Sequence, residues 1–183
     1  MFELTEESEV CLGGGAADLT QFGFGKDSSW QNTAEFIGAV IGIIALARLG
    51  INGEGVRLRG DSKTALKWGR EEKVSGAEAI NAAIVMSTVC VKFGIEINES
   101  EFLAGVLNWK ADDLSRCLQK GKSVREVMVE IGYGDKPILD LSEDTAAMRL
   151  LAACQPGLGV GSEAEFIEMW NEIRNASNEL RVN

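Results

Sequence analysis

The sequence has 183 residues, of which 45% are hydrophobic, and a chain of this size can bury one core with a small appendage. Its net charge of −10 argues against binding nucleic acid through bulk electrostatics, because an acidic surface repels phosphates. The longest apolar run, residues 36–47, falls short of the ~20 residues that a transmembrane helix needs, so we expect no membrane span.

The cysteines indicate the compartment. Four cysteines stand far apart in the sequence, and the chain has no histidine, so we do not expect a zinc site. The N-terminal segment is acidic and lacks the basic-then-apolar pattern of a secretion signal. We therefore expect reduced thiols in an intracellular protein, cytoplasmic or nuclear.

The first fifty residues predict two strands and a helix. Glycine clusters and alternating phenylalanines favour short antiparallel strands at about 2–12 and 19–25. The helix that follows is predicted to begin at an Asn32 or Thr33 cap and to end at Gly50. Its apolar residues cover most of its circumference, so we expect burial on several sides.

The middle of the chain predicts a mixed α/β arrangement. A strand with alternating apolar and basic residues ends at Asp61, the end of a strand at which α/β proteins tend to build sites. Further helices and one more strand are predicted after it, in the order helix, helix, strand, helix, at 62–71, 76–93, 101–106 and 111–120.

The character of the sequence changes after Lys122. A turn-rich, extended stretch precedes a helix of about three turns, predicted at 144–154, and a well-capped amphipathic helix, predicted at 162–180. We predict one domain over residues 1–120 and a mostly helical C-terminal extension over 121–183 that serves as connecting material.

Three segments, taken in order, carry a resemblance to a known family. They are QNTAEFIGAVIGIIAL at 31–46, LRGDSKTALKW at 58–68 and LNWKADDLSR at 107–116. Together they resemble the ribonuclease H family, and the last segment is most similar to the branch fused to reverse transcriptases of long-terminal-repeat retrotransposons. The resemblance implies a mixed sheet flanked by helices that hydrolyses the RNA strand of RNA–DNA hybrids.

The resemblance also implies a set of site residues. Glu35, Asp61 and Asp112 match catalytic acids that hold two Mg²⁺ ions, with Mn²⁺ as a substitute. Asn32 and Ser62 match positions that contact the hybrid or belong to the same strand-end motif. Carboxylates suit this chemistry because Mg²⁺ is a hard cation that prefers oxygen ligands, and such a site needs no histidine.

The sequence departs from the family at the first strand. Relatives carry there an aspartate that bridges both metals, and no residue before Glu35 matches it well; Asp18 is the nearest substitute. We expect a piece of a longer polyprotein that begins after the first strand, with weak or absent nuclease activity. Its implied partners are an RNA–DNA hybrid or other nucleic acid and a reverse-transcriptase module of the same polyprotein.

Each candidate residue also has an ordinary structural interpretation. Glu35 can be a helix-start acid, Asp61 a helix cap, and Asp113 can replace its neighbour Asp112 in the motif. A basic face beside Asp61 is more often solvated than phosphate-binding, and it consists of Lys63, Lys67 and Arg70. The alternative function is a non-catalytic interaction domain of the same fold, or a retroelement relic.

Overall fold

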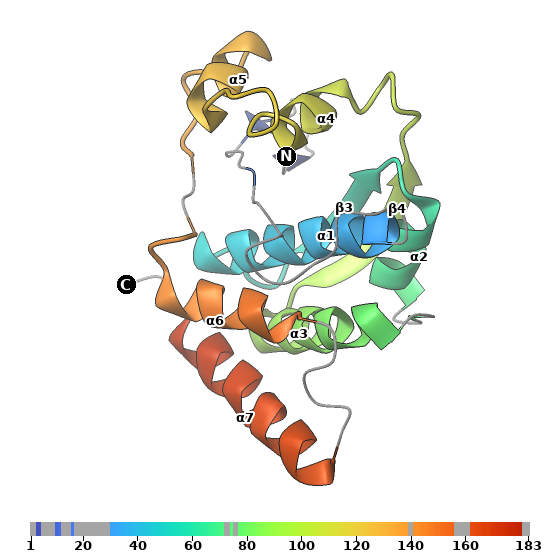
Figure 1. The fold of residues 1–183 in the computed structure, drawn as a ribbon, viewed down its shortest axis with the longest axis vertical. Helices are drawn as coiled ribbons and strands as arrows, with labels where there is room; N and C mark the ends of the chain where they lie inside the picture. Colours follow the sequence, from blue (N-terminus) through green and yellow to red (C-terminus); the bar gives the residue numbers. More distant parts are fainter. Residues whose placement is uncertain are drawn as a thin grey trace. The chain divides into compact units, whose positions relative to one another are not determined.

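The computed structural model describes residues 3–4, 10–11, 16, 30–71, 74, 77–138, 141–155 and 162–180. These residues form a mixed α/β fold that is mostly helical, with seven helices, a two-stranded parallel sheet and a two-stranded antiparallel sheet (Figure 1). The chain divides into two compact units, each built from two stretches of sequence. The small unit comprises residues 1–18 and 103–140, and the large unit comprises residues 19–102 and 141–183.

The large unit contains five helices and the parallel sheet among its described residues. In chain order these elements are α1 (Gln31–Arg48), β3 (Gly55–Gly60), α2 (Lys63–Glu71), α3 (Ala77–Phe93), β4 (Glu96–Phe102), α6 (Thr145–Ala153) and α7 (Glu163–Glu179). The helix α1 packs against α2 and α3, and α6 and α7 pack against each other and against α3. The predicted order of elements over this part of the chain is confirmed.

The central helix α1 is buried on several sides, as its apolar sequence predicted. Phe36, Val40 and Ile44 are completely buried, and the neighbouring turns are buried with them. The predicted cap is wrong: the helix begins at Gln31, and the residue before it makes no side-chain cap bond. The end is as predicted, because Gly50 follows with a positive φ of 74° that favours glycine.

The parallel strands β3 and β4 end side by side, and the candidate residues Asp61 and Ser62 directly follow the end of β3. Gly55 pairs with Glu96 and Gly60 with Phe102, with one irregularity in between. The strand β3 confirms the prediction, but the strand expected at 101–106 is wrong, because β4 begins five residues earlier. Its acidic residues are tolerated there because Glu99 and Glu101 pair with arginines of β3.

The two C-terminal helices belong to the large unit. Asp144 caps α6 through the Ala147 amide and also forms an ion pair of 2.5 Å with Arg48 at the end of α1. Arg149 bridges α6 to Glu172 and Glu179 of α7. The predicted domain boundary at residue 120 stays a prediction. The helices α6 and α7 contribute buried side chains to the large unit.

The small unit contains β1 (Glu3–Leu4), β2 (Val10–Cys11), α4 (Trp109–Ser115) and α5 (Val124–Glu130) among its described residues. The single strand predicted over 2–12 is wrong, because β1 and β2 pair antiparallel within that stretch; the strand predicted at 19–25 lies outside the described residues. The helix predicted at 111–120 runs over Trp109–Ser115 instead, followed by turns.

The core of the small unit joins α4 to α5, which the sequence analysis did not predict. Five buried side chains form it: Leu114, Cys117, Val127, Met128 and Ile131. A reciprocal capping box between Ser123 and Glu126 starts α5. None of the described helices in either unit is long and apolar enough to cross a membrane.

Candidate functional site

A side-chain hydrogen bond connects two of the predicted site residues. Ser62 lies two residues after the end of β3. Its Oγ donates a hydrogen bond to Oδ1 of Asn32 across 3.1 Å. The same Oγ accepts a hydrogen bond of 3.1 Å from the backbone N–H of Ala65. Ser62 is therefore buried, with 8% of its surface exposed, and holds the start of α2 against the first turn of α1.

Asp61 lies between the end of β3 and the start of α2. The interpretation of Asp61 as the helix cap is wrong, because the Ser62 hydroxyl accepts the cap bond from Ala65. Asp61 is exposed to solvent. Its carboxylate therefore lies at the carboxyl end of a parallel strand and does not cap the next helix.

Glu35 lies on α1, three residues after Asn32, and is half-buried. Residues three apart on a helix share one face, so Glu35 and Asn32 project from the same side of α1. The Ser62–Asn32 bond holds this side of the helix against the strand end that carries Asp61. The large unit thus brings four of the five predicted residues to one region.

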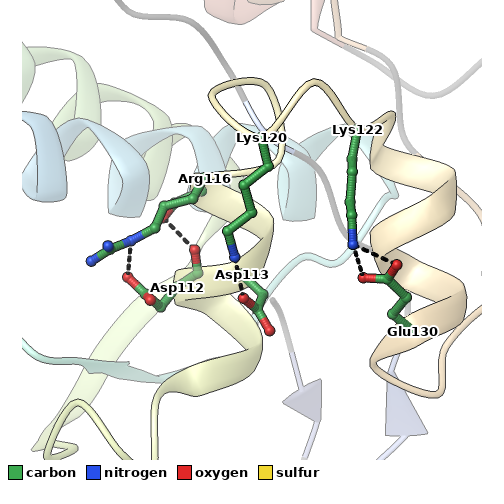
Figure 2. A network of polar contacts seen from close by, with 7 residues as sticks. Asp112, Asp113, Arg116, Lys120, Lys122 and Glu130 are labelled. Carbon is green, nitrogen blue, oxygen red and sulfur yellow. Dashed lines mark hydrogen bonds and ion pairs between the residues drawn. The ribbon is translucent and has the colours of Figure 1, made fainter.

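The fifth residue, Asp112, belongs to the small unit and lies in α4. Its Oδ1 accepts from Nε of Arg116 at 2.7 Å, one turn along the chain (Figure 2). The neighbouring Asp113 accepts from Nζ of Lys120, also at 2.7 Å. This hydrogen bond from Lys120, with the charges around it, holds the pKa of Asp113 below its usual value.

The ion pairs of the small unit make a charged surface around α4 and α5. Besides the two aspartate pairs, Lys122 contacts both carboxylate oxygens of Glu130, at 2.6 and 2.7 Å (Figure 2). The Lys122 pKa is raised, chiefly by this hydrogen bond. All these groups are exposed to solvent, so each pair contributes little to stability.

The metal prediction concerns residues of both units. Taken by itself, neither unit groups three Asp, Glu or Cys side chains as metal ligands within the residues that the structure describes. Glu35 and Asp61 could supply oxygen ligands from the large unit, which is the donor chemistry that Mg²⁺ prefers. Asp18, the substitute for the missing aspartate, lies outside the described residues. The Mg²⁺ site stays a prediction.

Phe102 lies at the same end of the sheet and was not among the predicted site residues. It is the last residue of β4 and stands opposite Gly60, one residue before Asp61. Phe102 is 47% exposed, and Nζ of Lys63 lies 4.8 Å from the centroid of its ring. The available signal was an aromatic residue ending an otherwise acidic strand.

Comparison with protein-family models, with curated proteins and with solved structures found no significant match to this chain. A function must therefore be argued from the residues of the chain and their geometry.

Proposed function

We propose that the chain is a ribonuclease H-like domain of a retroelement polyprotein, which hydrolyses the RNA strand of RNA–DNA hybrids by a two-metal mechanism. The observation that carries the proposal is the hydrogen bond between Ser62 and Asn32. It joins two of the three family-like segments, which are distant in sequence. A strand end carrying Asp61 and a helix face carrying Glu35 thereby come to one region.

The order of elements gives further support. A long buried helix precedes β3, two helices separate β3 from its parallel neighbour β4, and a short helix with Asp112 follows. The resemblance implies a helix, strand and helix in this order, each carrying one acid. We propose weak activity, because no residue before Glu35 matches well the aspartate that relatives carry on their first strand.

The proposed roles follow from the side chains. Glu35 and Asp61 would hold Mg²⁺ or Mn²⁺, and Asp112 is proposed as a further ligand on its motif alone. The ions would stabilise the attacking and leaving oxygens of the phosphodiester. Because Oδ1 of Asn32 accepts from Ser62, its Nδ2 remains to donate to a ribose or phosphate oxygen. Ser62 therefore acts as a positioning residue for the Asn32 amide.

The test is Mg²⁺-dependent cleavage of an RNA–DNA hybrid by the full chain. Asp61→Asn should lower the cleavage rate by more than the ~10–100-fold that losing an outer-shell partner of a metal site costs. A matched control is Glu54→Gln, because Glu54 is exposed and precedes the opposite end of the same strand. Equal cleavage by wild type and Asp61→Asn would refute the catalytic assignment.

A second candidate is a non-catalytic interaction domain with an acidic surface. The net charge of −10 favours it, and so do the arginine and lysine that already neutralise Asp112 and Asp113. Thermal unfolding in rising Mg²⁺ or Mn²⁺ separates the two proposals. A metal-dependent stabilisation that Asp61→Asn removes would count against the interaction domain, whereas no stabilisation in either protein would favour it.

A further inference from the structure

The contact between Lys63 and Phe102 lies beside the proposed site. Lys63 is the first residue of α2, two positions after Asp61, and Phe102 ends β4. The ammonium stands 4.8 Å from the ring centroid, within the range of a cation–π contact. Both residues belong to the large unit, so their contact does not depend on the placement of the small unit.

The ring of Phe102 is exposed for a reason that the register shows. Its neighbour across the parallel pair is Gly60, which has no side chain to cover the ring. Phe102 is therefore 47% exposed, although an aromatic ring gains most from burial. An open aromatic surface at the carboxyl end of a parallel pair is a suitable platform for a planar ligand.

Lys63 differs from two neighbouring cations, one on the sheet and one on the same helix. Arg57 pairs with Glu99 on the sheet, and Lys67 pairs with Glu71 one turn along α2. Over the part of the chain that the structure describes, Lys63 has the Phe102 ring as its contact and no acidic partner. Its charge is therefore available for an anion. In a chain with a net charge of −10, a local cation is what a phosphate contact requires.

We propose that Lys63 and Phe102 together contact the nucleic-acid strand beside the scissile region. Lys63 binds a backbone phosphate, and the ring of Phe102 stacks on the adjacent base or ribose. This inference rests on the proposed function, since it specifies how that site holds its substrate. Stacking suits the role because every base offers a π face, so the contact is independent of sequence.

The experiment measures binding of a fluorescein-labelled RNA–DNA hybrid to the full chain by anisotropy, in buffer without divalent ions so that no metal-dependent cleavage occurs. Phe102→Leu keeps an apolar side chain without the ring and should weaken binding by about tenfold. Phe102→Tyr keeps an aromatic ring and should bind as the wild type does. Lys63→Gln should weaken binding. The log of the association constant should also fall less steeply with log salt, by about 0.9 in slope, because one phosphate contact is lost.

Two control variants separate this contact from general surface effects. Lys67→Gln removes a charge one turn away on α2, and Trp170→Leu removes a ring that is 41% exposed on α7. Both should bind the hybrid as the wild type does. Thermal unfolding of each variant should match the wild type, so that lost binding reports the contact and not the fold.

The outcomes distinguish this inference from the nuclease proposal. If Phe102→Leu binds like the wild type, or Trp170→Leu loses as much, the inference is wrong even when Asp61→Asn abolishes cleavage. If Phe102 and Lys63 control binding while Asp61→Asn cleaves like the wild type, the contact stands and the catalytic assignment fails. A wild-type chain that binds no hybrid overturns the inference as well.

Discussion

The Ser62 hydroxyl donates to the Asn32 side chain across 3.1 Å while accepting the Ala65 amide, so one buried oxygen connects two helix starts. Ser62→Ala should therefore lower the free energy of unfolding by about 1–2 kcal/mol, from the lost cap and the lost partner. Urea unfolding measures this. The control is Asn32→Ala, which removes the exposed partner and leaves the cap, and should cost less. Equal losses in the two variants would contradict the dual role of Ser62.

The buried position of Leu150 predicts that α6 is part of the large unit and not a detachable tail. Leu150 is completely buried, in a helix that packs on α3 and α7. Leu150→Ala should lower the free energy of unfolding by about 2–5 kcal/mol, the cost of an internal cavity. Ile167→Ala, at a site on α7 that is 50% exposed, should cost far less. A similar small loss in both would indicate that α6 contributes little to the core.

The ion pair between Arg149 and Glu172 predicts a pH dependence with a definite sign. The hydrogen bond from Arg149 holds the pKa of the Glu172 carboxyl below its usual value. Its stabilising contribution is therefore present above the unfolded pKa of about 4.3 and is lost as pH falls through the lower folded pKa. Glu172→Gln should melt below the wild type at pH 7, and the difference should shrink as the pH falls below the unfolded pKa.

The matched control for Glu172→Gln lies on the same helix, α7. Glu168→Gln changes an exposed acid of the same helix and should leave the melting temperature close to that of the wild type at every pH. Because nearly half of the Glu172 side chain is exposed, the effect of Glu172→Gln should be small. A difference between Glu172→Gln and wild type that grows toward low pH would contradict the pairing.

The burial of Cys154 predicts a thiol that is inert in the folded protein. Cys154 is completely buried, and burial raises the pKa of its thiol far above the usual value. Since the thiolate is the reactive form, iodoacetamide at pH 8 should leave Cys154 unmodified until urea unfolds the chain. Mass spectrometry of the digested protein locates the label, with half-buried Cys90 as the internal comparison. Rapid labelling of native Cys154 would show that α6 opens readily.

Much of the large unit followed from local sequence signals. The apolar circumference of α1 and the alternation in β3 predicted both elements, and glycines after α1 and α3 marked their ends. The strand β4 was placed too late because three glutamates lower its strand propensity. Its pairing with β3, whose arginines neutralise Glu99 and Glu101, joins residues 42 positions apart and is not visible in the local sequence.

The candidate site was less accessible to sequence reasoning. The motif spacing identified Asn32 and Ser62, but not that they bond to each other, because they lie thirty residues apart. The cap was assigned to Asp61 and not to Ser62, because both residue types cap helices well and the sequence does not choose between neighbours. Phe102 was overlooked because its exposure depends on the glycine opposite it in the sheet.

The interrupted path of the chain also affects how the protein is made. Residues of the small unit separate β4 from α6 and α7, so the ribosome releases these two helices after the rest of the large unit. At ~5–20 residues added per second, the interval between the synthesis of α3 and that of α6 is on the order of seconds. During that interval the apolar surface of α3 is exposed to solvent, and a chaperone would bind the nascent chain there.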